Sequence, residues 1–278
     1  MLSFAICRSI RQFTRFFSSR FAVFLSAISV CLFFPIMVSA AQLLLFEGKA
    51  KHPDSDALLY TEKHRVIMND DGEYLSSFVE YLDPQGRVFA EKTLEFEKNK
   101  FAPDMMFHDH RSDQRVSVYL NQTEGEESVL QLQLERGQNR EETMIDVEPP
   151  FTLVDGGFDR FIHGNWQRLR QEKKLAFSFL AVTRSTLIDF EIEEIAADEA
   201  TVFFELRPQN VFINLLVEPI SLEYDINTKR LSKFSGLTNI ERFIEGEASD
   251  ENHVAEIQYT YEALKPFITL NTRRESNK

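Results

Sequence analysis

Apolar and polar residues alternate along most of the chain from Leu43 onward, and this period of two predicts a fold built from strands. Residues 87–97 give the clearest example. Val88, Ala90, Leu94 and Phe96 share one face, while charged side chains occupy the other. A strand with this pattern packs one face against a core and exposes the other to water.

Turn-forming sequences separate the alternating segments. Asp70-Asp71-Gly72 and Asp83-Pro84-Gln85-Gly86 divide segments 58–69, 74–82 and 87–97, which predicts an antiparallel meander. Further strands are expected at 114–121, 128–135, 142–147, 175–179, 188–192, 202–206, 220–226, 230–240 and 255–261. The fold class is therefore mainly β: a long curved antiparallel sheet or partial barrel, with one or two helices packed against it.

One helix is expected between Pro150 and Lys173, with Asp155 as its N-cap. The apolar residues at helical spacing are Phe158, Phe161, Ile162, Trp166 and Leu169. Segment 210–217 fits neither a helix nor a strand period. We expect one β-rich domain over residues 41–270 and a flexible tail over residues 271–278.

Residues 1–40 are typical of a cleavable signal peptide. Four arginines and no acidic residue precede an apolar run at 21–38, which ends in Val38-Ser39-Ala40. This order predicts export to the periplasm and cleavage after Ala40. Three other interpretations share these residues: an inner-membrane anchor at 21–38, an organellar presequence, and lipidation at Cys31.

Removal of the leader changes the composition of the chain. Both cysteines, Cys7 and Cys31, lie within it, so the mature chain forms neither a disulfide nor a thiolate metal site. Lys plus Arg falls from 31 to 27 while Asp plus Glu stays at 44, which gives a net charge of −17. Because this charge repels phosphate backbones, no nucleic acid partner is expected, and contact with a membrane is expected only through an uncleaved leader.

The sequence contains none of the common nucleophile, zinc-protease, Walker or dinucleotide-binding motifs. Ionisable residues nevertheless fall on apolar faces of neighbouring predicted strands: Glu62, His64, Glu80 and Lys92. Such groups are costly unless paired or hydrated, so they line a wet concavity or form a salt-bridged cluster. They are the candidates for acid–base catalysis in a hydrolase.

His108 and His110 would share a face if their segment is extended, and two imidazoles can begin a metal site. No third ligand is identifiable by spacing, so neither a metal nor a cofactor is predicted. Loop histidines beside Asp109 and Arg111 are the alternative interpretation.

Phenylalanine is unusually frequent, with 26 residues against only 10 glycines. Large rings fill cores and also line apolar cavities. The candidate ligand-binding rings are Phe158, Phe161, Trp166, Phe177, Phe179, Phe190 and Phe204. A lipid or another apolar small molecule is the ligand that they favour.

Several segments resemble a family of exported proteobacterial proteins of unknown function. These are residues 58–64 (LLYTEKH), 81–86 (YLDPQG), 222–225 (LEYD) and 234–240 (FSGLTNI). That family implies no established activity, ligand or catalytic residue.

The architecture is also similar, at the level of fold, to the periplasmic lipoprotein carrier and its outer-membrane receptor, which hold acyl chains. The first hypothesis is therefore a periplasmic binding or carrier protein for a hydrophobic ligand. A scaffold or assembly factor that contacts envelope proteins, and a hydrolase that uses the carboxylate, His and Lys cluster, are the alternatives.

Overall fold

The computed structural model describes residues 41–122, 128–147, 150–210, 218–244 and 246–267. They belong to the compact unit 39–278, which is separate from residues 1–38. The predicted leader, most of the ambiguous segment 210–217 and the predicted tail lie outside the described residues. No helix in the described part of the chain is both long and apolar enough to cross a membrane.

The described strands form one 16-stranded sheet. Its strands are β1 (Gln42–Lys51), β2 (Leu58–Met68), β3 (Tyr74–Leu82), β4 (Val88–Glu95), β5 (Asp104–Asp109), β6 (Gln114–Asn121), β7 (Val129–Arg136), β8 (Asn139–Asp146), β9 (Thr152–Leu153), β10 (Lys174–Ala181), β11 (Thr186–Ala197), β12 (Thr201–Pro208), β13 (Ile220–Asp225), β14 (Leu231–Ile244), β15 (Glu247–Tyr261) and β16 (Lys265–Pro266). The spatial order runs from β8 down to β1, then from β15 down to β9, and β16 pairs with β1.

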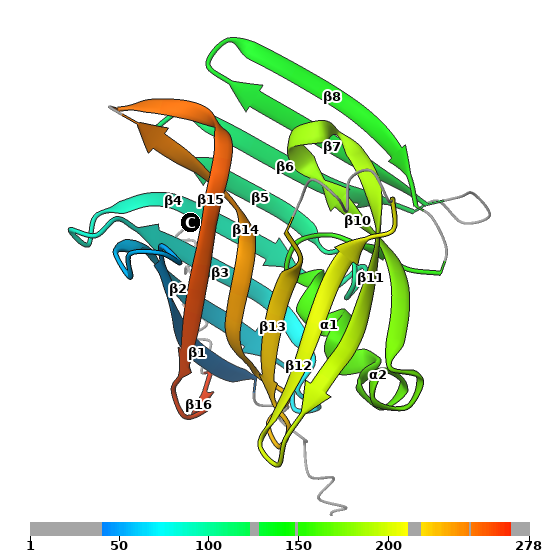
Figure 1. The fold of residues 1–278 in the computed structure, drawn as a ribbon. Coiled ribbons are helices and arrows are strands. Elements are labelled where there is room, and N and C mark those ends of the chain that lie inside the picture. Colours follow the sequence, from blue (N-terminus) through cyan, green and yellow to red (C-terminus); the bar gives the residue numbers. More distant parts are fainter. Residues whose placement is uncertain (1–40, 123–127, 148–149, 211–217, 245, 268–278) are drawn as a thin grey trace, which may run out of the picture. The chain divides into compact units, whose positions relative to one another are not determined.

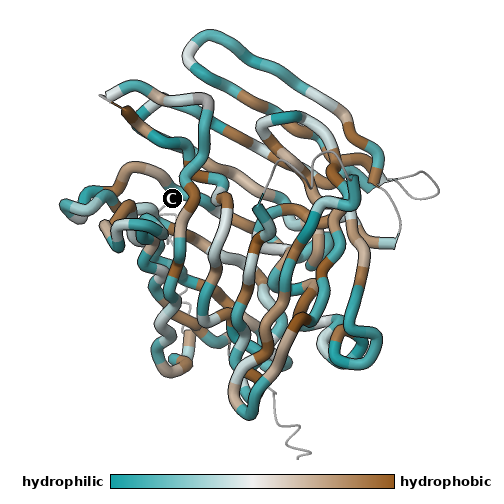
Figure 2. The backbone as a smooth tube through the Cα atoms, in the orientation of Figure 1, coloured by the Kyte–Doolittle hydropathy of each residue, from teal (hydrophilic) through white to brown (hydrophobic). Residues whose placement is uncertain are grey.

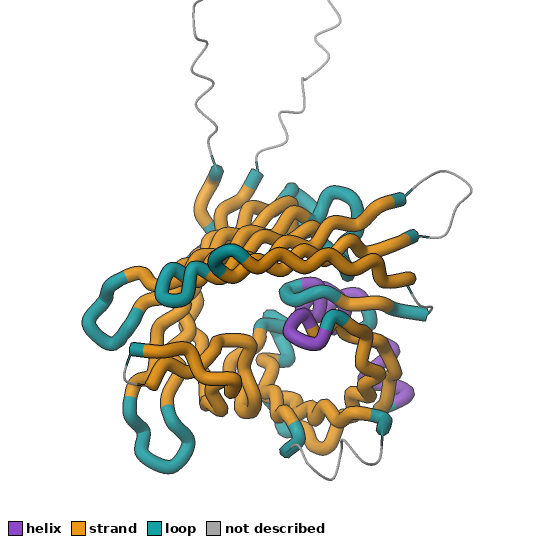
Figure 3. Tube along the Cα trace, turned by 90° about the horizontal axis from the view of Figure 1, so that it is seen from above, coloured by secondary structure: helices purple, strands orange, loops and turns teal. Residues whose placement is uncertain are grey.

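Neighbouring strands are antiparallel throughout this order, except that β9 runs parallel to β10. The sheet curls on itself, so that β1–β8 form one wall and β10–β15 curve round to face it (Figures 1 and 3). The prediction of a mainly β fold with a long curved sheet is confirmed. The predicted strands at 74–82 and 114–121 match β3 and β6 residue for residue.

Alternation of side chains explains why the sheet curls round an interior. Along β4, Ala90, Lys92 and Leu94 are buried, while Glu91 and Thr93 between them are partly exposed. Apolar and hydrophilic positions alternate in the same way along many strands of Figure 2. Where burial alternates in this way, the buried residues of a strand face the inside of the curl.

Two short helices, α1 (Gly157–Gly164) and α2 (Trp166–Glu172), replace the single predicted helix. They separate at Asn165, whose side-chain amide donates to the carbonyl of Phe161 at 3.0 Å. Phe161 and Trp166 both enter a core cluster with strands β10–β13. The break lets consecutive helices present both rings to the same core.

The start of α1 is fixed by contact with the chain before β5. A methyl group added to Gly157 would lie 1.9 Å from the carbonyl oxygen of Phe101, so no larger residue fits there. That same carbonyl accepts the backbone N–H of Val154 at 3.0 Å. The segment that leads into α1 is therefore held against the wall of β4 and β5.

The β14–β15 hairpin contacts strands of the β1–β8 wall. Glu241 on β14 pairs with Arg136 on β7, and its backbone carbonyl accepts a hydrogen bond from Arg111 at 3.2 Å. The guanidinium of Arg111 stacks on Phe89 and Phe243, which belong to the two walls. These contacts hold the two parts of the curled sheet together.

Candidate functional site

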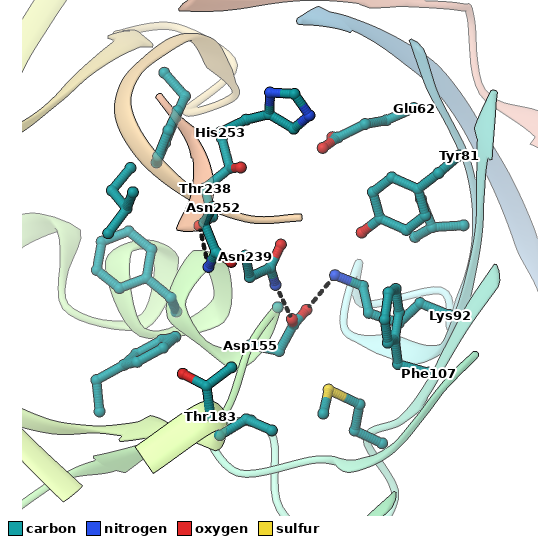
Figure 4. A pocket seen from close by; sticks show the side chains of 18 of the residues that line it. Glu62, Tyr81, Lys92, Phe107, Asp155, Thr183, Thr238, Asn239, Asn252 and His253 are labelled. Atoms are coloured by element: carbon teal, nitrogen blue, oxygen red, sulfur yellow. Dashed lines mark hydrogen bonds and ion pairs between the residues drawn. The ribbon is translucent and has the colours of Figure 1, made fainter. Parts of the chain in front are cut away.

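A large cavity of about 1580 Å³ lies inside the curled sheet. It exceeds the range of about 300–1,000 Å³ that is usual for small-molecule sites. Its lining is mostly apolar and comes from strands of both walls, from α1 and from the turn after β10. Figure 4 shows its polar side chains converging from separate parts of the chain.

The lining contributed by strands β10–β13 is almost wholly apolar. Its members are Phe177, Phe179, Leu180, Ala181, Ile188, Phe190, Leu206, Pro208, Ile220, Leu222 and Tyr224. The single polar group among them, the hydroxyl of Tyr224, donates to Asp159 on α1 at 3.3 Å. This region offers an incoming molecule contact with hydrocarbon and aromatic rings only.

Lys92 on β4 is one of the charged residues that the β1–β8 wall contributes to the cavity. Its ammonium lies 2.7 Å from the carboxylate of Asp155, and their side chains are only 9% and 13% exposed. Burial alone lowers the pKa of Lys92, but Asp155 and Tyr81 outweigh it and raise that pKa, so the ammonium stays charged. Asn239 on β14 completes the group by donating to Asp155 at 2.9 Å (Figure 4).

Asp155 is not the helix N-cap that the sequence predicts. The N-cap of α1 is Gly156, which makes no side-chain capping bond. Asp155 has a φ of 42°, in the left-handed region that Asp tolerates better than most residues. From this position its carboxylate pairs with Lys92 and Asn239, and it is not available to the helix.

Glu62 on β2 forms a second polar group. Its carboxylate accepts hydrogen bonds from His64 at 2.9 Å and from the hydroxyl of Tyr259 on β15 at 3.2 Å. Burial, followed by the charge of Glu62, raises the pKa of Tyr259, so its hydroxyl remains a donor. The carboxylate is thus held by two donors inside an apolar wall.

Gly48 on β1 permits this contact. It is the cross-strand neighbour of both Glu62 and Tyr259, which lie on the strands to either side. A methyl group at Gly48 would lie 2.6 Å from Cε1 of Tyr259. The missing side chain lets the tyrosine ring cross β1 and reach the carboxylate.

The next cross-strand row is aromatic. Phe46 stacks on His64 with ring centroids 4.1 Å apart, and on Tyr261 with centroids 4.7 Å apart. These residues pair across β2, β1 and β15. The row fixes the imidazole of His64 beside Glu62.

His253 and Asn252 on β15 are two further polar residues of the site (Figure 4). Burial first, and then the charges of Arg111 and Arg242, lower the pKa of His253 to about 4, so its ring is neutral at pH 7. The amide of Asn252 donates to the carbonyl of Thr238 at 2.9 Å. Both side chains border the cavity.

The structure separates the four catalytic candidates. Glu62, His64 and Lys92 line the cavity, but Glu80 does not. Glu80 lies on the outer face of β3, 3.4 Å from Arg65, because Val79 and Tyr81 occupy the buried face. The apolar residues Phe78 and Leu82 predicted that Glu80 faces inward, but Phe78 lies on the outer face beneath Arg65, and the register shifts between Tyr81 and Leu82.

The aromatic candidates also divide. Phe158, Phe177, Phe179 and Phe190 line the cavity. Phe161, Trp166 and Phe204 instead pack into the filled core beside the helices, at 0%, 7% and 0% exposure. These three rings are structural because a close-packed core leaves no surface for a ligand.

His108 and His110 lie side by side, with ring centroids 4.2 Å apart. His108 is on β5, while His110 lies in the turn that follows it, so the alternative interpretation as loop histidines holds for His110 alone. Each ring faces a separate carboxylate, Asp113 at 3.0 Å and Glu91 at 3.5 Å. Within the described ranges, no three His, Cys, Asp or Glu residues are placed to hold a metal ion.

Sequence reasoning missed several polar residues of the cavity. Asp155 was assigned to a helix cap, while Asn239, Asn252 and His253 had no assigned role. The available signal is that Asn239 and Asn252 are amides within long strands, where Asn is uncommon.

No family model matches this chain, and no curated protein matches it. Among solved structures it is similar to a β-barrel-like protein from Brucella abortus that belongs to a domain family of unknown function, DUF1849. The identity is 7% and the TM-score 0.38, over 83% of this chain and 98% of that chain. The function proposed below therefore rests on the cavity itself.

Proposed function

We propose that this protein binds or carries a hydrophobic ligand, such as a lipid or an acyl chain, in the cavity of the curled sheet. The observation that carries the proposal is the size of the cavity, about 1580 Å³, together with its mostly apolar lining. Burial of apolar surface is the main source of affinity in such a site.

The placement of the rings supports a site and not a packing defect. Phe179 and Phe190 are only partly buried where they pack against the helix core, and they border the cavity. Ile188 also borders it and belongs to none of the buried core clusters. An apolar molecule would cover these side chains, which the fold leaves without a full set of neighbours.

We further propose that the domain acts after export, with residues 1–40 serving as a cleaved signal peptide. The support is the order of arginines, apolar run and small residues before Ala41. N-terminal sequencing of the protein recovered from its host tests this. An intact Met1 on the recovered chain would rule out cleavage after Ala40.

Ligand binding is tested on the full mature protein purified from its own host. Native mass spectrometry and solvent extraction should recover an apolar molecule. After delipidation, the protein should take up Nile red, an uncharged apolar dye, with a rise in dye fluorescence.

A pair of variants on β11 makes the test specific. Ile188→Asp places a charge in the apolar part of the cavity and should weaken dye binding at least about tenfold. Ile195→Asp changes a side chain on the same strand that is 53% exposed and does not line the cavity, so binding should be unchanged. A ligand-free protein that takes up no dye would refute the proposal and favour the scaffold alternative, and equal effects of the two variants would place the dye elsewhere.

A further inference from the structure

Among the described residues, no buried cation of the cavity is free to pair with an anionic ligand. Lys92 is already neutralised by Asp155 at 2.7 Å. Arg136 and Arg242, which border the cavity, pair with Glu241 and Glu251. For a ligand carboxylate or phosphate inside the cavity, these three cations are therefore already paired with acidic side chains.

Arg184 is the one basic lining residue in the described ranges without an ion-pair partner. It is exposed and belongs to the short 3₁₀ turn Val182–Arg184, between β10 and β11. An exposed arginine contributes little to ion pairing, because water screens it. Arg184 is therefore a weak anchor at the rim.

The overall charge of the lining also disfavours an anionic ligand. Among the described residues that border the cavity, eight are Asp or Glu and four are Lys or Arg, so the formal charge is −4 with neutral histidines. One of these acids, Glu62, faces the inner wall with its carboxylate held by His64 and Tyr259. An anionic headgroup would meet net repulsion, while a cationic one would compete with the two donors that already satisfy Glu62.

Neutral hydrogen-bonding groups do remain open to the cavity. The carboxylate of Asp155 and the carbonyl of Thr238 only accept, so the amide nitrogens of Asn239 and Asn252 must face them. The amide oxygens of both residues are left without a partner in the described part of the chain. Two open acceptors therefore border the cavity.

His253 supplies the complementary group. Neither of its ring nitrogens is hydrogen-bonded within the described residues, although its ring lies near that of Tyr60. Because the ring is neutral at pH 7, one nitrogen donates and the other accepts. Asn239, Asn252 and His253 together match a headgroup whose hydroxyl or amide groups both donate and accept.

We propose that the ligand is a neutral amphiphile. Its uncharged head, which carries hydroxyl or amide groups, lies against Asn239, Asn252 and His253, and its apolar tail extends along β10–β13. This inference rests on the proposed function and names the class of ligand within it. It excludes free fatty acids and phosphorylated lipids as the preferred ligands.

The test compares amphiphiles that share one tail and differ in the head. Monolauroylglycerol, laurate and dodecyltrimethylammonium compete with Nile red for the delipidated full mature protein. Monolauroylglycerol should displace the dye at a concentration at least about tenfold lower than the other two, with little dependence on salt.

Two substitutions locate the head. His253→Phe keeps a ring but removes its hydrogen bonds, and should weaken monolauroylglycerol about two- to tenfold while leaving laurate unchanged. His110→Phe, at an exposed ring outside the cavity, is the matched control and should change neither.

The outcomes separate the two proposals. If Nile red does not bind, the proposed function itself fails. If the dye binds but laurate competes as well as monolauroylglycerol, or if Arg184→Gln abolishes tight laurate binding, the carrier function stands and the neutral headgroup is wrong. The competition between laurate and monolauroylglycerol uses the unmodified protein, so it remains decisive even if His253→Phe does not fold.

Discussion

Replacement of Lys92 by Met should strongly destabilise the fold. At 2.7 Å, two unit charges attract by about 6 kcal/mol at an effective dielectric constant of about 20, and desolvation of both groups offsets most of this. The intact pair thus contributes little net stability. Without Lys92, however, the buried carboxylate of Asp155 keeps only Asn239 as a side-chain partner among the described residues, and we expect a loss of about 3–5 kcal/mol.

The assay is equilibrium urea unfolding at pH 7, with a matched exposed pair as control. Lys51 and Asp56 are also 2.7 Å apart, but their side chains are 42% and 80% exposed. Lys51→Met should therefore cost no more than about 1 kcal/mol. The difference between the two lysine variants isolates the effect of burial.

A double variant tests whether the cost comes from the unpaired charge. Asp155→Asn keeps a residue that tolerates the φ of 42° and can still bond to Asn239, but it removes the charge. Combined with Lys92→Met, it should restore stability to within about 1–2 kcal/mol of the wild type. The reasoning is refuted if Lys92→Met costs no more than Lys51→Met, or if the double variant is as unstable as Lys92→Met alone.

Three further predictions concern packing and pH. Gly48→Ala brings a methyl group to within 2.6 Å of the Tyr259 ring, so urea unfolding should show a loss of about 1–3 kcal/mol; an unchanged midpoint would contradict this packing. Gly157→Ala meets the rigid backbone carbonyl of Phe101 at 1.9 Å and should cost more than about 3 kcal/mol in the same assay, whereas wild-type stability would show that the backbone yields. Because the pKa of His253 is lowered from 6.5 to about 4, the unfolded chain binds a proton that the folded chain does not, and stability falls as pH drops from 6.5 towards 4. Because this ring is only half-buried, we expect the free energy of unfolding to fall by about 1–2 kcal/mol over this pH range, measured by urea unfolding at each pH. The His253→Gln variant should lose less stability over the same range. If the wild type and the variant show the same pH dependence, the lowered pKa of His253 is refuted.

Strand positions were predictable wherever one face of the strand is wet and the other buried. Segments 74–82 and 114–121 have this alternation, and the structure reproduces both ranges. Strand β5 was missed because Met105 and Met106 are consecutive apolar residues, which hides the period of two. In the structure their exposures are 4% and 50%, so the alternation exists but both side chains are apolar.

The helical region was predictable in type but not in detail. Apolar residues at helical spacing run through 158–169, and the structure places helices there. The break at Asn165 follows Gly164, and this Gly-Asn pair is a known signal for a helix end. The apolar spacing continues across the break because both helices pack against the same core. It therefore predicted one continuous helix in spite of that signal.

Only the site residues that alternate with apolar residues on predicted strands could be predicted from the sequence. Glu62, His64 and Lys92 are ionisable residues in apolar rows, and the structure places all three on the cavity wall. Tyr259 bonds to Glu62, Asp155 pairs with Lys92, and Asn239 donates to Asp155. All three lie on distant elements, so a single sequence gives no reason to join them. Long-range pairing of this kind follows from the curl of the sheet, which local periodicity does not encode.

The two errors at the site have different physical causes. Glu80 was placed inward because it alternates with the apolar residues Phe78 and Leu82, but Phe78 lies on the outer face beneath the guanidinium of Arg65, and Leu82 is buried only beyond a register shift. Asp155 was predicted to be a helix N-cap, although its left-handed backbone turns its carboxylate towards Lys92. Periodicity arguments assume regular strands and helices, so they fail at an irregular position such as Asp155. At Asp155 the irregular backbone also brings a carboxylate to the cavity wall. For this reason Asp155→Asn, which preserves the turn and removes the charge, separates the electrostatic part of the site from its geometry.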